Sequence, residues 1–370
     1  MSYGRGDIID LIEQNMDKLV LKKVTVGFDG YIDEIVRPVK KRKKDNMAFY
    51  KTIEDFAQRL LMSKNSACEM EIIRQAVKIG GNAPIMAHAL SRLGIDTNAV
   101  GAFGYPKINS YFEKHSDNLH LYSVAEPAYT TAIEFEDGKV MFGRNENLGD
   151  INWSNIENIL GKEKIGQLIK ESFIIAVTNW SSLYGMNDII KGIKSKMDAI
   201  GADKVVMSKY IFFDMADSSR RDREEIIEGL NLMKRFDENA HIIFSLNENE
   251  ARIVNRCFFE ESEDIYETAK NIFKVLRPHL LIIHPNNRAI LLAEGESEEV
   301  KDFFVQKPII STGGGDNFNA GFCSGLAMKL SLKICLYLGR ACASYYIKNG
   351  YSPSLDQLIY YMKKYWEGEM

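Results

Sequence analysis

Short apolar runs alternate with amphipathic helical segments through most of the second half of the sequence. The pattern predicts strands at 173–177, 210–214, 240–245 and 280–284, and helices at 187–200, 222–235, 248–255 and 264–275. Strands that are separated by helices run parallel, and the helices pack on both faces of the sheet. The alternation therefore predicts an α/β fold with a doubly wound, mostly parallel sheet. A strand pair at 289–293 and 301–305 is expected to follow it.

One hairpin interrupts this order in the first half. The sequence there predicts helices at 7–19, 53–62 and 85–93 and strands at 23–28, 69–77 and 98–102. Tyr129–Phe135 and Lys139–Arg144 are joined by Glu136-Asp137-Gly138, and an Asp-Gly pair favours a tight hairpin turn. We expect the hairpin to belong to a small sheet that stands apart from the main one as a lid.

The length of 370 residues suits one large α/β domain. No repeat or low-complexity linker divides the sequence, so we expect a single domain over 1–370, with a lid formed by parts of about 31–52 and 129–145. The basic run Lys40-Lys41-Arg42-Lys43-Lys44 is expected at a solvated hairpin or loop tip. Steering of anionic ligands is an alternative role for it.

Composition excludes several classes of protein. The net charge of −4 argues against binding to nucleic acid, whose phosphates attract basic surfaces. The longest apolar runs, such as Phe173–Val177, are far shorter than the ~18 residues that a membrane helix needs. The first residues contain no apolar signal core, so we expect a cytoplasmic protein. The five cysteines lack C-x-x-C spacing and are interpreted as reduced thiols.

The glycine cluster Gly313-Gly314-Gly315, followed by Asp316, is the strongest chemical signal. It precedes a segment with apolar residues at Phe318, Phe322 and Leu326, the spacing of a buried helix face. Glycines before a helix expose its first backbone N–H groups, which together with the helix dipole favour an anion. Asp316 beside such a cradle suggests a base for phosphoryl chemistry. The alternative is a glycine-rich turn in which Asp316 caps the helix.

A second group of polar residues suggests a substrate site. Asp29 and Asp33 follow the strand at 23–28, and ligands of open α/β sheets bind beyond the carboxyl ends of strands. Carboxylates suit a polyhydroxylated substrate because each accepts several hydroxyl hydrogen bonds. Gly80-Gly81-Asn82 precede a helix in the same way as the later glycines and let ligand atoms approach the backbone. From these two residues alone, a turn Asp and a solvated Asp are the favoured explanation.

Asn247 and Glu250 lie three residues apart at a predicted strand–helix junction. Oxygen ligands of this type suit Mg²⁺, which keeps most of its waters and takes one or two protein contacts near phosphates. A capping box, in which Asn247 caps the helix and Glu250 stands at its third position, explains the same spacing without a metal.

Together these motifs resemble the ribokinase (PfkB) superfamily of carbohydrate kinases, which has an N-terminal Gly-Gly segment, an N-x-x-E segment and a C-terminal G-A-G-D segment. The match runs from about Gly27 to Pro353. It implies a ribokinase-like fold with a small β-sheet lid, Mg²⁺ as cofactor and ATP as co-substrate. The implied site residues are Asp316 as catalytic base; Gly313, Gly314 and Gly315 as anion hole; Asp33, Gly80, Gly81 and Asn82 at the sugar, beside Asp29; Asn247, Thr312, His284 and Asn286 at the nucleotide; and Asn247 and Glu250 at the metal.

The chain departs from the family pattern at four places. Ile310 stands where the family has Asp, Gly314 replaces the Ala between the glycines, Ile85 replaces an Asn, and 284–289 replaces a Thr-x-Gly-x-x-Gly segment. The chain also resembles the ADP-dependent sugar kinases, but it is shorter than is usual for them, which favours ATP. The same motifs are compatible with a nucleoside kinase and with a non-catalytic regulator that binds a sugar or a nucleotide. The resemblance also allows a homodimer of this chain through the lid, because the family includes such dimers.

Other nucleotide-binding classes are disfavoured by the motifs themselves. Gly27-Phe28-Asp29-Gly30 does not supply the G-x-G-x-x-G of a dehydrogenase, and the sequence contains no G-x-x-x-x-G-K-[ST] of a P-loop enzyme.

Overall fold

A large sheet forms the centre of the molecule. The computed structural model describes residues 4–44, 46–113, 116–201, 209–310 and 312–369. Nine described strands pair in the order β14-β13-β12-β11-β10-β9-β1-β5-β6, and all neighbours are parallel except β12–β13 and β13–β14. In chain order they are β1 (Lys23–Phe28), β5 (Asp96–Gly101), β6 (Leu119–Ser123), β9 (Ile174–Thr178), β10 (Tyr210–Asp214), β11 (His241–Leu246), β12 (Leu280–Ile283), β13 (Ala289–Ala293) and β14 (Glu296–Val300). The predicted doubly wound, mostly parallel sheet is confirmed.

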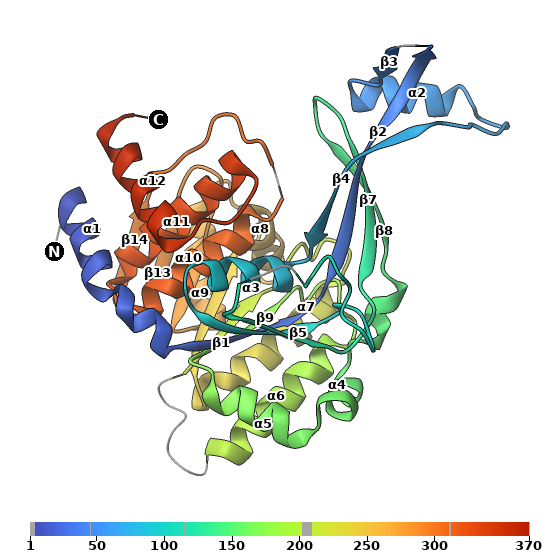
Figure 1. Ribbon diagram of the computed structural model, residues 1–370. Coiled ribbons are helices and arrows are strands. Elements are labelled where there is room, and N and C mark those ends of the chain that lie inside the picture. Colours follow the sequence, from blue (N-terminus) through green and yellow to red (C-terminus); the bar gives the residue numbers. More distant parts are fainter. Residues whose placement is uncertain (1–3, 45, 114–115, 202–208, 311, 370) are drawn as a thin grey trace.

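Helices cover both faces of this sheet (Figure 1). One apolar core packs beneath α1 (Arg5–Asn15), α3 (Asn82–Arg92), α10 (Gly314–Ala327), α11 (Leu332–Asn349) and α12 (Leu355–Glu367). A second core packs beneath α4 (Trp153–Leu160), α5 (Lys162–Glu171), α6 (Met186–Gly201), α7 (Arg223–Lys234), α8 (Glu248–Arg256) and α9 (Ile265–Leu276). The strand side chains alternate between the two cores, as the period of a strand requires. None of the helices in the described part of the chain is long and apolar enough to cross a bilayer.

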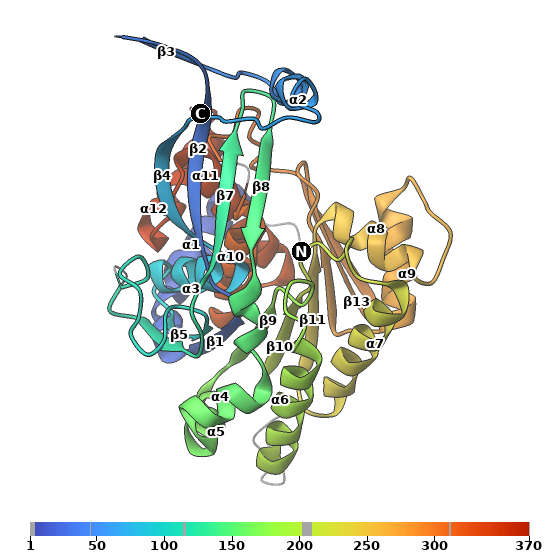
Figure 2. The same cartoon turned by 90° about the vertical axis from the view of Figure 1, so that its right-hand side faces the viewer.

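A smaller sheet rises from the carboxyl edge of the large one (Figure 2). Its strands pair in the order β3-β2-β7-β8, and β4 also pairs with β2. They are β2 (Tyr31–Lys43), β3 (Asn46–Phe49), β4 (Ile72–Gly80), β7 (Ala128–Glu134) and β8 (Lys139–Arg144). The helix α2 (Ile53–Leu61) covers the far end with a small core of its own around Phe56. The predicted hairpin is confirmed as β7–β8, whereas the single-domain boundary and the homodimer stay predictions.

The basic run Lys40–Lys43 lies at the exposed end of β2, next to the turn into β3. Lys40 and Arg42 form ion pairs with Asp55 and Glu71 of neighbouring segments. The solvated position that was expected for this run is therefore observed.

The prediction of a strand at 301–305 was wrong. The partner of β13 is β14 at 296–300, which follows directly after a tight turn at Gly295. Gly295 has φ +73°, a conformation that glycine adopts without steric cost, so this turn fixes the register of the pair. Phe303, which suggested the strand, is buried instead against Tyr365 and Trp366 of α12.

Two predicted helices have different boundaries. The first α-helix ends at Asn15 and continues as a 3₁₀ helix over Met16–Leu21. The helix after Gly80-Gly81 begins at Asn82, three residues earlier than expected, because Gly81 serves as its N-cap residue.

Candidate active site

The first turn of α10 places Asp316 at the carboxyl edge of the large sheet. Gly313 is the N-cap residue with φ +81°, so the chain turns into the helix through a conformation that favours glycine. Asp316 makes no capping bond; its Oδ1 accepts a hydrogen bond from Nδ2 of Asn82, 3.0 Å away, at the start of α3. The alternative interpretation of Asp316 as a helix cap is therefore wrong. The two glycine motifs, far apart in the sequence, meet at this bond.

Two cavities meet at Asp316. One, of about 630 Å³, lies beneath the smaller sheet, and the other, of about 900 Å³, lies beside α8, α10 and α11. Asn82, Ile310, Gly313 and Asp316 line both. A molecule in either cavity can therefore approach the same carboxylate. We call them the lid-side cavity and the glycine-side cavity.

The lid-side cavity is lined by polar side chains from the smaller sheet. Asp33 on β2 is adjacent to Thr130 on β7 in the strand register, and Lys139 on β8 lines the same cavity. Burial raises the pKa of Asp33, while a hydrogen bond from Thr130 and the charge of Lys139 act in the opposite direction. These groups can bind several hydroxyls of one ligand.

Gly80 and Gly81 have different roles at this cavity. A Cβ on Gly80 would lie only 2.3 Å from Oδ2 of Asp33, so the glycine makes room for that carboxylate, although Gly80 does not line the cavity itself. Gly81, with φ +95°, and Asn82 do line it.

Asp29 lies outside the lining of both cavities. It is 0% exposed and accepts hydrogen bonds from the backbone N–H groups of Asn82 (2.9 Å) and Ala83 (2.7 Å) and from Nδ2 of Asn179 (2.6 Å). Asp29 thus accepts hydrogen bonds from the first backbone N–H groups of α3. The N-cap residue Gly81 cannot do so because it has no side chain. The structure gives Asp29 a supporting position and not the substrate contact that was expected.

Asp316 is 6% exposed and stands among other carboxylates. Burial, and then the charges of Asp214 and Asp29, raise the pKa of Asp316 well above its ordinary value. A carboxylate with a raised pKa is a stronger base, because its protonated form is stabilised relative to its charged form.

The glycine-side cavity contains most of the residues that were predicted at the nucleotide. Gly313, Gly314, Gly315, Asn247, His284 and Asn286 line it, whereas Thr312 lines the lid-side cavity. The His284 ring stacks on Phe318 at 4.6 Å, and burial lowers the pKa of His284 to about 4. His284 is therefore neutral at physiological pH and forms a wall beside Gly315.

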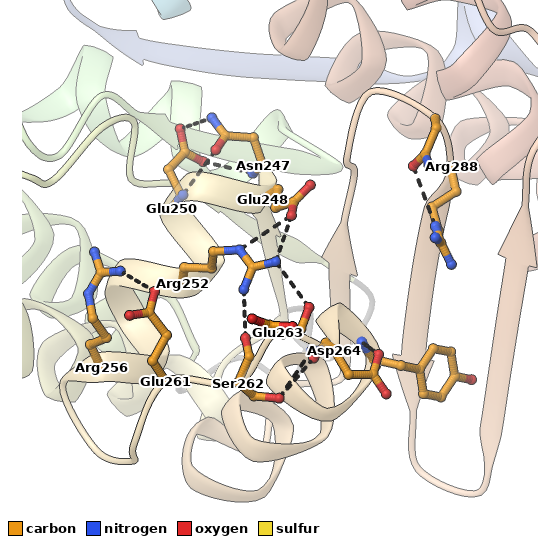
Figure 3. Close-up of polar contacts among 12 residues, drawn as sticks. Asn247, Glu248, Glu250, Arg252, Arg256, Glu261, Ser262, Glu263, Asp264 and Arg288 are labelled. Atoms are coloured by element: carbon orange, nitrogen blue, oxygen red, sulfur yellow. Dashed lines mark hydrogen bonds and ion pairs between the residues drawn. The ribbon is translucent and has the colours of Figure 1, made fainter.

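Asn247 and Glu250 form the capping box that the spacing allowed (Figure 3). The Oε2 of Glu250 accepts from the backbone N–H of Asn247, and its Oε1 accepts from Nδ2 of Asn247. Both residues also line the glycine-side cavity, and burial together with the charge of Asp214 raises the pKa of Glu250. A nearby cation would relieve this repulsion, so the pair fits Mg²⁺ held through water. Among the described residues, no three His, Cys, Asp or Glu side chains form a direct metal cage.

Comparison with known proteins identifies the family. The model of the prokaryotic ketohexokinase family matches residues 6–365, nearly the whole chain. The chain belongs to the prokaryotic ketohexokinase family. It is therefore a ketohexokinase-like sugar kinase of the ribokinase family, which confirms the resemblance inferred from the motifs.

Similar proteins agree with this assignment. A ketohexokinase of Haloferax volcanii is 26% identical over 339 residues, which cover 91% of this chain and 89% of that protein. The ribokinase of Arabidopsis thaliana complexed with ribose and ATP has a TM-score of 0.65 and 14% identity, covering 93% of this chain and 99% of the ribokinase. A nucleoside kinase of Methanocaldococcus jannaschii has a TM-score of 0.59 and 16% identity, covering 93% and 98%. At these identities the solved structures show a shared fold.

Several cavity residues of this ketohexokinase-family chain were not found from the sequence. Asn179 lies just beyond β9 and Asp214 ends β10, so the rule that singled out Asp29 would also have indicated them. Alternation along the hairpin would have placed Thr130 on one face. Tyr346 and Arg340 carried no such signal, because they lie within the long helix α11 and reach the cavities only through helix packing.

Proposed function

We propose that this chain transfers the γ-phosphoryl group of ATP to a hydroxyl of a ketohexose, with Asp316 as the general base. One observation carries the proposal: Asp316 lies in the wall that the lid-side and glycine-side cavities share. A sugar in the first cavity and a nucleotide in the second would meet at this carboxylate. The ketohexose is suggested by the family and by the Haloferax relative.

In the proposed reaction, Asp316 takes the proton of the sugar hydroxyl as its oxygen attacks the γ-phosphorus. The hydrogen bond from Asn82 fixes the orientation of the carboxylate, and the raised pKa of Asp316 makes it a competent proton acceptor. The first backbone N–H groups of α10 have no partner within the helix and point toward its N-terminal end. Gly314 and Gly315 keep that end open, so these amides can stabilise charge on the transferring group.

The glycine-side cavity is proposed to hold the donor. Two solved structures of the same fold support ATP as the donor. They are the ribokinase of Arabidopsis thaliana with ribose and ATP, and a ribokinase II of E. coli with ATP and Mg²⁺. Asn247 and Glu250 would hold a magnesium ion through water. Such an ion would neutralise charge on the donor phosphates.

The smaller sheet is proposed to act as a lid. Asp33, Thr130 and Lys139 come from three of its strands and line the cavity over Asp316. Movement of this sheet toward the large one would surround the sugar and exclude water, which otherwise competes as phosphoryl acceptor.

A panel of donors and acceptors tests the proposal. Purified protein with Mg²⁺ is given ATP or ADP, each with a ketohexose, an aldopentose or a nucleoside, and the phosphorylated product is quantified. We expect turnover with ATP and a ketohexose such as fructose. Preferred turnover of a nucleoside would establish a nucleoside kinase, the activity named for the Methanocaldococcus jannaschii structure. Turnover with ADP alone would overturn the choice of donor.

A further inference from the structure

Tyr346 on α11 reaches across the start of α10 and lines the lid-side cavity. A Cβ on Gly313 would lie 2.9 Å from the Tyr346 hydroxyl and 3.0 and 3.1 Å from the ring carbons Cε1 and Cζ. The hydroxyl end of the ring therefore lies on the N-cap residue of α10. The backbone N–H groups of Ile309 and Ile310 donate to the carbonyl of Ile347 at 2.8 and 3.2 Å. These bonds join the segment before the glycines to α11, so the position of the tyrosine relative to α10 is fixed.

The Tyr346 hydroxyl is available to a ligand. It makes no hydrogen bond to another residue in the described part of the chain, and its oxygen is not sealed from solvent. Burial, and then the charges of Asp316 and Asp33, raise the pKa of Tyr346 to about 12. The phenol is therefore protonated at neutral pH and can both donate and accept a hydrogen bond. It lies close enough to the two carboxylates of the cavity for their charges to act on it.

Two other positions in the wall of this cavity are apolar. Ile85 and Ile310 both line it, and each replaces a polar residue of the family pattern, an Asn and an Asp. A bound sugar needs a partner for each hydroxyl that it buries, because a buried polar group without a partner costs about 1–3 kcal/mol. Tyr346 supplies a hydroxyl to a wall in which these two positions supply none.

Tyr346 faces the proposed acceptor and not the donor. It lines the lid-side cavity, whereas the next residue, Ile347, lines the glycine-side cavity. The start of α10 lies between these two side chains, since a Cβ on Gly313 would meet Tyr346 and a Cβ on Gly314 would meet Ile347. A hydrogen bond from Tyr346 would therefore go to the sugar.

We propose that the Tyr346 hydroxyl forms a hydrogen bond with a non-reacting hydroxyl of the sugar and so holds the reacting hydroxyl against Asp316. This inference deepens the proposed function and rests on it for the assignment of the lid-side cavity to the sugar. It also gives Gly313 a second purpose, because any side chain there would collide with the phenol.

Tyr346→Phe tests the proposal because it removes the hydroxyl and keeps the ring against Gly313. In steady-state kinetics with fructose and Mg-ATP, we expect the KM for fructose to rise about 3- to 10-fold, the value of one neutral hydrogen bond. The kcat should stay within about twofold and the KM for ATP should not change, because the contact is equally strong before and during the reaction. An unchanged KM for fructose, or a loss confined to kcat, would overturn the proposal.

The matched control is Tyr345→Phe, one residue earlier on the same helix. Tyr345 is 8% exposed, lines neither cavity, and donates its hydroxyl hydrogen to Tyr351 at 3.0 Å. This variant also loses one phenolic hydrogen bond, and it should keep the wild-type KM for fructose. A rise in KM equal to that of Tyr346→Phe would show that the effect comes from the packing of α11, and it would contradict the inference.

Deoxy analogues identify the partner of the hydroxyl without any turnover. Wild type and Tyr346→Phe are titrated calorimetrically with fructose and with its monodeoxy analogues, each of which lacks one hydroxyl, in the presence of a non-hydrolysable ATP analogue. We expect one analogue to bind equally well to both proteins, because the hydroxyl that Tyr346 contacts is already missing from it. The other analogues should retain the difference between the two proteins. A difference that persists for every analogue would overturn the proposal.

The two proposals fail in different ways. If fructose binds with the expected loss in Tyr346→Phe but no sugar is phosphorylated, the proposed function is wrong and the role of Tyr346 stands. If fructose is phosphorylated with the same KM by the wild type and by Tyr346→Phe, the proposed function stands and the role of Tyr346 is wrong.

Discussion

At the scale of single residues, Asp316 is the group on which the proposed chemistry depends. Asparagine has the same shape but cannot accept a proton, so Asp316→Asn should lower kcat by roughly 10²–10⁴. Nucleotide affinity should stay nearly unchanged, because the glycine amides are intact. Steady-state kinetics and nucleotide titration measure the two effects. Asp356→Asn, an exposed residue in the first turn of α12, is the matched control, and wild-type turnover in Asp316→Asn would remove Asp316 from its role.

Asp29 leads to a prediction about stability. Asp29→Ala would leave three buried donors without their acceptor, including two amides at the start of α3. We expect a loss of about 2–4 kcal/mol in the free energy of unfolding, measured with urea. The exposed cap Asp222 of α7 is the comparison, and Asp222→Ala should cost only about 1 kcal/mol. Equal losses would show that Asp29 is an ordinary cap.

Asp214 leads to a prediction about pH. Burial raises the pKa of Asp214 from 3.8 to about 6, although Nδ2 of Asn319 and the N–H of Ala216 donate to it. A folded pKa above the unfolded one gives stability that is present below about pH 4 and is lost as the pH rises through 6. A shift of this size corresponds to about 3 kcal/mol.

Asp214→Asn removes this titration. In the wild type, the Ser245 hydroxyl donates to Oδ1 of Asn319. In the variant, the Asn319 amide can rotate so that its NH₂ group donates to the Ser245 hydroxyl and its oxygen accepts from the amide introduced at position 214. This is possible because a hydroxyl can both donate and accept. Urea unfolding without Mg²⁺ should therefore show that the variant gains stability relative to the wild type between pH 4 and 7. If the difference in unfolding free energy between the variant and the wild type does not change with pH, the raised pKa of Asp214 is contradicted.

At the scale of elements, the start of α10 combines a structural and a chemical role. Gly314 is its first residue, and a Cβ there would come within 3.1 Å of Cγ2 of Ile347, a contact that a small side-chain movement can relieve. Gly314→Val would nevertheless fill the space in front of the free amides. We expect nucleotide affinity to fall at least about tenfold while the melting temperature changes by only a few degrees.

The matched control for Gly314→Val is Gly166→Val in α5, where a Cβ would meet nothing within 4 Å. It introduces the same side chain into a helix and lies outside both cavities, so nucleotide titration should give the wild-type affinity. Unchanged affinity in Gly314→Val would count against the anion hole.

At the scale of the whole molecule, the smaller sheet stands on one edge of the large one (Figure 2). If it closes over the sugar, amide hydrogen exchange in β2, β7 and β8 should slow several-fold when ketohexose and a non-hydrolysable ATP analogue are both bound. The edge strand β14, at the far side of the large sheet, is the internal control. Equal exchange with and without ligands in the smaller sheet would exclude closure.

The order of elements and the chemical motifs could be read from the sequence, because both are encoded in short stretches. The period of apolar residues gave the alternating strands and helices, and it failed at 301–305, where a tight turn at Gly295 overrode it. Gly313, Gly314, Gly315 and Asp316 were recognisable because they combine exposed backbone N–H groups at a helix start with an adjacent carboxylate within four residues. Asp33 and Asn82 were placed by the rule for strand ends and helix starts.

What the sequence alone determined is therefore the fold class and the residues able to carry phosphoryl chemistry. Only the tertiary structure decided that Asn82 bonds to Asp316, that Asp29 supports α3, and that Arg340 lines the glycine-side cavity. These relations join residues from distant parts of the chain, and local periodicity contains no information about such pairs. They arise from the way the helices pack on the sheet, which is fixed by the two apolar cores as a whole.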